Sequence, residues 1–218
     1  MSFQAVYTYI MKIGLSRHGK ERLAYDESLS DHKSSNYSEL ETITHNGIDR
    51  MLMQSDLRDI YHSVKVIGFN SSANGNLIGK VYVQLSDNTD EKRLREIVKK
   101  YLRMYNFSLG GTDLFATPVQ AELDAYDFDE CQTEIYQDCS ENAHCFNLQG
   151  TYTCSCREGF ADISDNAIYP GRDCIPEQLG CETCHYHGTC FTKSDDQVLC
   201  ECFQWYTGKS CQINLKCE

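Results

Sequence analysis

The stretch CQTEIYQDCSENAHCFNLQGTYTCSC, residues 131–156, decides how the C-terminal part of this chain must fold. It contains five of the thirteen cysteines, and none of the thirteen occurs before Cys131. A unit this small buries too little apolar surface for a stable core, so disulfides must replace the core. Disulfides at this density persist in an oxidising compartment, which predicts that the chain works outside the cell or in the secretory lumen.

The cysteine spacings form two sets. The first six cysteines are separated by seven, five, eight, one and seventeen residues, and the next six by two, five, nine, one and eight. The first set is followed at its fifth cysteine by Arg157-Glu158-Gly159-Phe160, and the second carries Tyr206-Thr207-Gly208 before its last cysteine. Six cysteines allow many pairings, so the spacing alone leaves the connectivity open.

Both sets resemble EGF-like modules. That resemblance implies bridges from first to third, second to fourth and fifth to sixth cysteine, each contributing about 2–4 kcal/mol. The implied pairs are Cys131–Cys145, Cys139–Cys154, Cys156–Cys174, Cys181–Cys190, Cys184–Cys200 and Cys202–Cys211. The long gap before Cys174 predicts an inserted loop at 162–170. Cys217 has no mate in either set, so it is expected to open a further module or to pair with another chain.

A zinc site is the alternative for the second set, because Cys181-x2-Cys184-His185-Tyr186-His187 has ligand-like spacing. The oxidising compartment and the complete set of implied disulfides disfavour it.

Acidic residues precede the first set, and an amide follows its third cysteine. Asp127-Phe128-Asp129-Glu130 and the stretch CFNLQGTYTC (145–154) resemble the calcium-binding version of the EGF-like module. The resemblance implies side-chain ligands at Asp127, Glu130 and Asn147, and carbonyl ligands at Phe128, Leu148 and Thr151; Asp129 is not a ligand. Calcium prefers such a mixture of oxygens. The expected role of Ca²⁺ is to stiffen the segment before Cys131; the alternative is a plain acidic linker.

The cysteine-free part predicts an α+β fold. Odd positions from Phe3 to Leu15 are mostly apolar, which indicates a strand with one buried face. The order strand, helix, helix, strand, strand, helix, strand predicts an antiparallel sheet with helices on one face. After the first strand, the expected elements are helices at 37–52 (interrupted at Asn46-Gly47) and 55–61, a hairpin at 64–69 and 81–85, a helix at 88–105 and a strand within 112–119.

Length and element order over residues 2–118 resemble a SEA module, with the best local match at 61–83, which ends in IGKVYV. Many SEA modules cut themselves at a Gly-Ser pair in this hairpin. Here Lys80 follows Gly79, so the hydroxyl nucleophile is missing and we expect an intact chain.

The chain is therefore expected to be multidomain: an α+β SEA-like sandwich followed by two small disulfide-rich EGF-like β-hairpin modules. The predicted boundaries are 1–120 for the SEA-like domain, 121–130 for an acidic linker, 131–175 for the calcium-binding EGF-like module, 181–212 for the second module and 213–218 for a tail.

Sugar attachment is predicted at five positions. Asn36, Asn70 and Asn106 each begin an Asn-x-Ser sequon. Thr189 matches an O-fucose pattern in the second module, and Thr207 resembles an O-GlcNAc position, with Trp205 replacing the usual glycine.

The net charge of −12 disfavours nucleic acid as a partner. Residues 92–100 alternate in sign and are expected to form a solvated helix face. The N-terminus lacks a signal-peptide pattern and no stretch reaches ~20 apolar residues, so we expect a fragment whose membrane anchor, if any, lies outside this chain.

The expected function is a non-enzymatic, calcium-binding extracellular region of a cell-surface or matrix glycoprotein, with an adhesion or spacer role and an extracellular protein or glycan as partner. One alternative is a growth-factor-like receptor ligand, disfavoured because Ser210 stands where arginine is expected although Leu215 fits. Another is the stalk of a membrane-anchored protease.

Overall fold

The computed structural model describes residues 6–73, 75–192 and 197–216, and these form two compact units. The first comprises the described residues up to Asp129 together with Gln149–Thr151. The second comprises Glu130–Leu148 and the described residues from Tyr152 onward. The predicted fold class is confirmed: an α+β domain with an antiparallel sheet and two helices, followed by small disulfide-rich hairpin modules. Cys217 lies outside the described residues.

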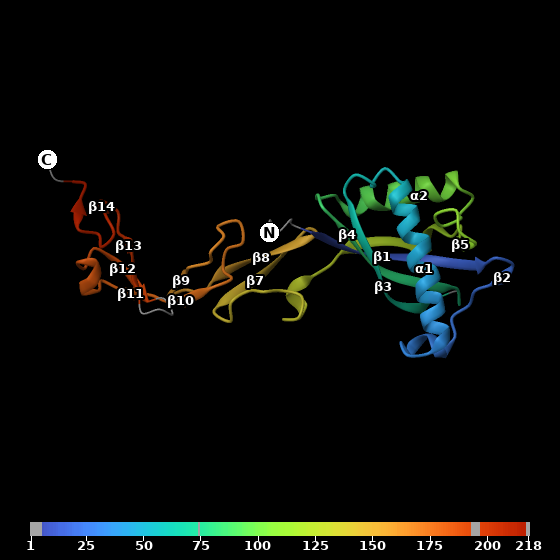
Figure 1. Cartoon of the computed structure of the whole chain (residues 1–218), viewed down its shortest axis with the longest axis horizontal. Helices are drawn as coiled ribbons and strands as arrows, with labels where there is room; N and C mark the ends of the chain where they lie inside the picture. Colours follow the sequence, from blue (N-terminus) through green and yellow to red (C-terminus); the bar gives the residue numbers. More distant parts are fainter. Residues whose placement is uncertain (1–5, 74, 193–196, 217–218) are drawn as a thin grey trace. The chain divides into compact units, whose positions relative to one another are not determined.

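The first unit is built on strand β1, Tyr7–His18, which lies at the centre of a six-stranded sheet (Figure 1). On one side it pairs antiparallel with β4, Leu77–Leu85, which pairs with β3, Tyr61–Ser71. On the other side it pairs with β5, Leu114–Ala116, and β6, Leu123–Asp127. A short strand β2, Glu21–Arg22, folds back on the end of β1.

The alternation of apolar residues in β1 places its odd-numbered side chains on the buried face of the sheet. Tyr9, Met11, Ile13 and Leu15 are at most 1 % exposed and belong to one apolar core with residues of both helices. This core, rather than any covalent link, holds the first unit together.

Helix α1, Ser35–Gln54, begins at an N-cap in which Ser34 Oγ accepts a hydrogen bond from the Tyr37 N–H at 3.0 Å. The predicted interruption at Asn46-Gly47 is wrong, because the helix continues through both residues. A Cβ on Gly47 would lie 3.1 Å from Leu109 Cβ, so the glycine permits close packing instead of breaking the helix.

The predicted second helix at 55–61 is also wrong. Ser55 ends α1, since its N–H and its Oγ both donate to the Leu52 carbonyl, and a turn then leads into β3. A short 3-10 helix that the sequence did not indicate, η1 at Glu27–Ser30, precedes α1.

Helix α2, Glu91–Met104, is capped by Asp90, whose carboxylate accepts from the Arg93 N–H at 2.6 Å. The predicted apolar stripe is buried at Leu94, Val98, Tyr101 and Leu102.

The second unit consists of short hairpins. β7 (Ala143–Leu148) pairs with β8 (Thr151–Cys156), and β9 (Phe160–Asp162) with β10 (Cys174–Pro176). In the last module, β11 (Gln178–Leu179), β12 (Gly188–Thr192) and β13 (Val198–Cys202) form a three-stranded sheet, and β14 (Tyr206–Thr207) pairs with β15 (Ile213–Asn214). The remaining 3-10 helices are η2 (Gln120–Glu122), η3 (Glu130–Gln132) and η4 (Glu182–Cys184).

The cores of these modules are small. The buried members of one are Ala143, Cys154 and Cys174, and those of the other are Cys184, Cys190 and Cys211. Half-cystines therefore supply most of the buried side chains in the second unit.

Candidate functional site

The acidic segment begins inside the sheet of the first unit. Asp127 is the last residue of β6 and lies opposite Tyr9 of β1. Its Oδ1 accepts a hydrogen bond from the Gly150 N–H at 2.5 Å, and the Gly150 carbonyl accepts from the Thr8 N–H at 2.8 Å. The range predicted as a linker, 121–130, thus contains a sheet strand, and one predicted calcium ligand is held at the end of that strand.

Gly150 fits this position because of its conformation and its neighbours. Its φ of +75° favours glycine, and a Cβ would lie 2.5 Å from the Tyr9 hydroxyl oxygen. The adjacent Gln149 donates from Nε2 to Glu91 Oε2 at 2.9 Å. These contacts fix the turn that leads to Thr151, a predicted carbonyl ligand.

The buried phenol of Tyr9 is an uncharged neighbour of Asp127 and Gly150. It is fully buried, and its hydroxyl faces two acceptors, Asn88 Oδ1 at 2.6 Å and the Thr89 carbonyl oxygen. Burial, with a smaller contribution from the charge of Asp127, raises the pKa of Tyr9 to about 12, although the hydrogen bond to the Thr89 carbonyl opposes the shift. The phenol is therefore neutral at extracellular pH and adds no negative charge beside Asp127.

The second unit holds the other predicted side-chain ligands. Glu130 begins η3 and is 6 % exposed, whereas Asn147 lies exposed on β7. The Cys131–Cys145 disulfide joins the residue after Glu130 to a residue of β7, and η3 contacts β7. A carboxylate that is largely withdrawn from water favours a cation among its neighbours.

The donor chemistry fits calcium. Asp127 and Glu130 supply carboxylates, Asn147 supplies an amide oxygen, and Phe128, Leu148 and Thr151 supply carbonyl groups. Hard oxygens of mixed charge, without thiolate or imidazole, are what calcium selects. Asp127, Phe128 and Thr151 belong to the first unit, and Glu130, Asn147 and Leu148 to the second.

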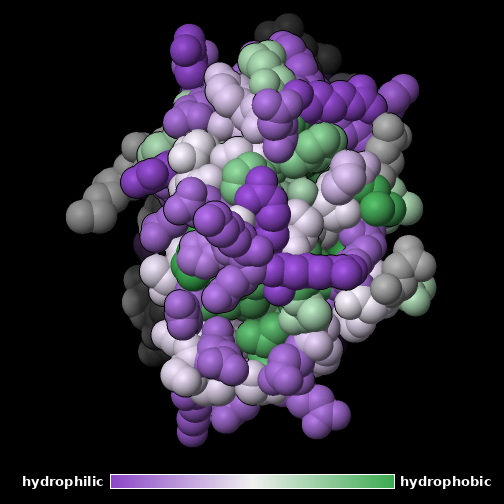
Figure 2. Space-filling model, turned by 90° about the vertical axis from the view of Figure 1, so that its right-hand side faces the viewer, coloured by the Kyte–Doolittle hydropathy of each residue, from purple (hydrophilic) through white to green (hydrophobic). Residues whose placement is uncertain are grey.

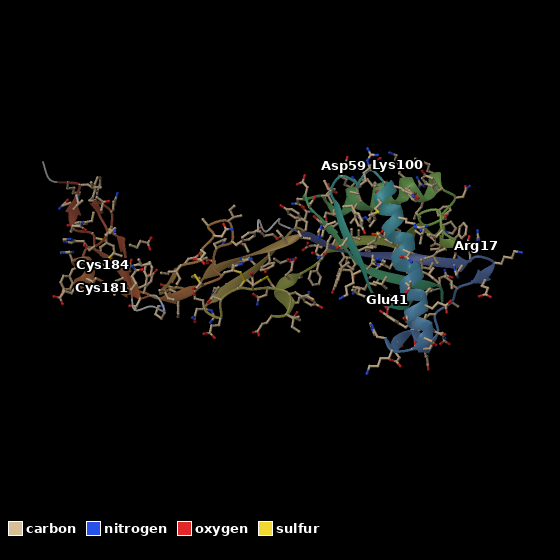
Figure 3. The ribbon with its side chains drawn as sticks, in the orientation of Figure 1. Arg17, Glu41, Asp59, Lys100, Cys181 and Cys184 are labelled. Atoms are coloured by element: carbon tan, nitrogen blue, oxygen red, sulfur yellow. A yellow bond between two sulfur atoms is a disulfide. The ribbon has the colours of Figure 1, made fainter. Side chains whose placement is uncertain are left out.

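The disulfides of the structure have the pairing that the resemblance implies: Cys131–Cys145, Cys139–Cys154, Cys156–Cys174, Cys181–Cys190, Cys184–Cys200 and Cys202–Cys211. The sulfur atoms of Cys181, Cys184 and Cys190 lie within 4.8 Å of one another, as in a zinc site. All three belong to disulfides, and a disulfide sulfur is not the thiolate that zinc requires. Figure 3 labels Cys181 and Cys184 in this module.

The inserted loop before Cys174 is ordered by Asp162 and Arg172. Asp162 Oδ2 accepts from the Gly171 N–H at 2.7 Å. The Arg172 guanidinium lies 4.8 Å from the ring centroid of Tyr152 and donates to Asp138 Oδ1 at 2.7 Å.

The predicted sugar sites differ in exposure. Asn36, Asn70, Asn106 and Thr207 are exposed. Thr189 is 8 % exposed, and its hydroxyl donates to the Glu201 carbonyl at 3.4 Å.

Gly79 and Lys80 lie within β4, in register with β1 on one side and β3 on the other. The pairing with β1 is regular here, whereas the pairing with β3 shifts register between Val66 and Gly68, next to Lys80. Because Lys80 stands in place of a serine, the hydroxyl nucleophile for self-cleavage is missing.

The sequence did not indicate the roles of Tyr9, Gln149 and Gly150. Gly150, directly before Thr151, was the available signal, since a glycine at a hairpin turn often marks a positive φ.

Comparison with known proteins agrees with this architecture. Residues 6–110 match the SEA domain, and residues 127–174 match the calcium-binding EGF domain. The chain contains a SEA domain followed by a calcium-binding EGF domain. A further disulfide-rich module follows, and the EGF match spans all six predicted calcium ligands. Modules of these two kinds are typically non-catalytic.

Two curated relatives share parts of the chain. The "63 kDa sperm flagellar membrane protein" of Strongylocentrotus purpuratus is 28% identical over 206 residues, covering 86% of this chain and 40% of that protein. The "Transmembrane cell adhesion receptor mua-3" of Caenorhabditis elegans is 36% identical over 88 residues, covering 40% of this chain and 2% of the receptor. The chain thus spans less than half of either relative. Both names describe membrane proteins; among the described residues of this chain, no helix is long and apolar enough to cross a bilayer.

Proposed function

We propose that this chain is a non-enzymatic, calcium-binding extracellular region of a cell-surface or matrix glycoprotein. The observation that supports the proposal is the position of Asp127. This residue ends strand β6 of the SEA sheet and is also the first residue of the calcium-binding EGF match. An ion bound there would act on the segment that joins the SEA domain to the EGF domain, and stiffening of that segment is the expected effect.

In the proposed site, Asp127, Glu130 and Asn147 bind Ca²⁺ through their side chains, and Phe128, Leu148 and Thr151 through their carbonyl oxygens. The ion would supply positive charge that balances two carboxylates close together in sequence. The chain's own residues prepare the site: Gly150 fixes Asp127, and the Cys131–Cys145 disulfide fixes the turn that begins at Glu130. A carboxylate pair with one amide gives affinities on the order of 10⁻⁴–10⁻³ M, typical of extracellular modules.

The proposed cellular role is adhesion or spacing at a cell surface, with an extracellular protein or glycan as partner. The cysteine content supports an extracellular location, and the relative named as an adhesion receptor supports adhesion over growth-factor signalling.

Calcium titration calorimetry on the secreted chain tests the metal site. Glu130→Gln should weaken binding at least tenfold, because it removes a charged ligand oxygen. Asp129→Asn is the matched control, since it removes the same charge from the neighbouring residue and should bind nearly as wild type. Equal effects of the two variants would show that the segment attracts calcium only by its net charge, and would refute the ligand assignment.

A further inference from the structure

The SEA domain carries a groove whose role the calcium site leaves unexplained. It lies where the end of β1, strand β2, helix η1 and the first half of α1 meet, and its volume is about 330 Å³. This is at the lower end of the roughly 300–1,000 Å³ range of small-molecule sites. Figure 2 looks onto the face that carries β2, where apolar groups show in a hollow among polar side chains. The lining residues on which the inference depends are Leu23, Leu29, Asn36, Glu39, Leu40 and Ile43.

The floor and the rim of the groove differ in chemistry. The floor is aliphatic, and two of its side chains, Leu23 and Ile43, remain only half-buried. The rim carries hydrogen-bond acceptors, notably the carboxylates of Asp26 and Glu39. A ligand that suits both must present an apolar face and several hydroxyl donors.

Asn36 stands on the rim of the same groove, and it begins the sequon Asn36-Tyr37-Ser38. Its side chain is exposed in the first turn of α1, and its Nδ2 donates to Ser28 Oγ at 3.1 Å. Ser28 is itself fixed: its N–H donates to Asp26 Oδ1 at 2.9 Å, and its carbonyl accepts from Ser34 Oγ at 2.7 Å. The attachment nitrogen is therefore oriented by the groove's own residues.

We propose that an N-linked glycan on Asn36 covers this groove, with its first N-acetylglucosamine lying on the apolar floor. The ring face and the acetyl methyl group would cover Leu23 and Ile43, and the sugar hydroxyls would donate to the acceptors of the rim. Covering half-buried aliphatic side chains stabilises the fold by the hydrophobic effect, and tethering through Asn36 removes most of the entropic cost of binding.

The modification is a group transfer in the secretory lumen from a lipid-linked oligosaccharide diphosphate. The Asn36 Nδ2–C1 bond of the sugar forms, the bond between C1 and the diphosphate oxygen breaks, and the lipid diphosphate leaves while Nδ2 loses one proton. Nδ2 keeps its second hydrogen, so the hydrogen bond to Ser28 Oγ can persist in the glycosylated protein.

The other two sequons provide internal controls. Asn70 lies in β3 and Asn106 follows α2, and neither lines this groove. A glycan on either residue would increase solubility without covering the floor.

The test uses the full chain secreted from a host that makes high-mannose glycans, trimmed to one sugar by endoglycosidase H. One form keeps only the first sequon (Asn70→Gln with Asn106→Gln), and its match adds Ser38→Ala, which abolishes the sequon and retains Asn36. A third form keeps only the sequon at Asn106 (Ser38→Ala with Asn70→Gln). Ser38→Thr in the first form preserves the sequon and controls for the change at residue 38.

Intact mass should show a sugar on Asn36. Hydrogen exchange of segments 23–29 and 39–43 should be several-fold slower with one sugar on Asn36 than in the Ser38→Ala match, with a melting temperature higher by a few degrees. Ser38→Thr should keep this protection, and the form with a sugar on Asn106 should exchange like the sugar-free chain. An unmodified Asn36, or equal exchange with and without its sugar, would overturn the proposal.

Discussion

The two units of this chain reach stability by different routes. The first buries a continuous apolar core from β1, β3, β4 and both helices and contains no cysteine. In the part of the second that the structure describes, there are two small cores of mostly half-cystine side chains and six disulfides. Large domains can rely on burial because the buried fraction of their surface grows with size, whereas small modules must constrain the unfolded state instead.

This difference gives each unit its own spectroscopic signal. Among the described residues, both α-helices lie in the first unit, so the far-ultraviolet helix signal reports on its core. The single tryptophan, Trp205, lies in the second, so its fluorescence reports on the disulfide-rich part.

The largest expected effect is that of reduction. Loss of a native disulfide from a small module costs about 2–5 kcal/mol, so a reducing agent should unfold the second unit. The Trp205 emission should move to that of exposed indole while the helix signal persists. A simultaneous loss of the helix signal would show that the first unit also depends on the disulfides.

The corresponding change in the first unit is the truncation of a core side chain. Leu52→Ala removes a fully buried side chain from α1 and should lower the free energy of unfolding of the first unit by about 2–5 kcal/mol. Met53→Ala is the control, because Met53 is 56 % exposed. Denaturant titration by helix signal should separate the two variants, and equal midpoints would contradict the assigned core.

A smaller effect is expected at the turn that the first unit shares with the EGF hairpin. Gly150→Ala and Gly159→Ala both place a side chain at positive φ, which costs about 1–2 kcal/mol. Gly150→Ala adds a collision with Tyr9, worth about 1–3 kcal/mol, whereas Gly159 has no other atom within 4 Å of its Cβ position. Thermal melting of the two variants measures the difference; equal losses would mean that the Tyr9 contact is unimportant.

The smallest effect concerns alkaline pH. Burial raises the pKa of Tyr9 to about 12, and burial also raises the pKa of Tyr37 and Tyr101. A raised pKa means that the folded state favours the neutral phenol, so this stability is complete below the unfolded value near 10 and is lost as pH rises toward 12. The helix signal should weaken over that interval, and Tyr9→Phe should lessen the dependence. An unchanged pH profile in Tyr9→Phe would exclude a contribution from Tyr9.

The sequence predicted the features that depend on local pattern. A short segment of sequence is enough to recognise each of these features: the alternation in β1, the apolar stripe of α2 and the spacing of the cysteines. The predictions that were wrong depend on contacts between residues far apart in sequence. Gly47 was predicted to interrupt a helix, but it allows Leu109 to pack closely against α1. Ser55 was predicted to begin a second helix, but it ends α1.

In the candidate site, too, local pattern predicted some features and non-local packing determined the others. The resemblance of residues 127–154 to a known module indicated the ligand types. Strand β6, however, was interpreted as part of an acidic linker, because two of its five residues are aspartates. Its place in the sheet comes from pairing with β1, a strand more than 100 residues earlier in the chain, which no local pattern reveals.

The most direct test of the central claim is hydrogen exchange of segment 128–131 during a calcium titration of the secreted chain. The pairing of β6 with β1 should keep residues 123–127 protected throughout and provide the internal reference. The account predicts that exchange in segment 128–131 slows as calcium fills a site with a dissociation constant on the order of 10⁻⁴–10⁻³ M, and that Glu130→Gln, but not Asp129→Asn, abolishes the change. Exchange that is indifferent to calcium in the wild-type chain would contradict the claim that the ion stiffens this segment.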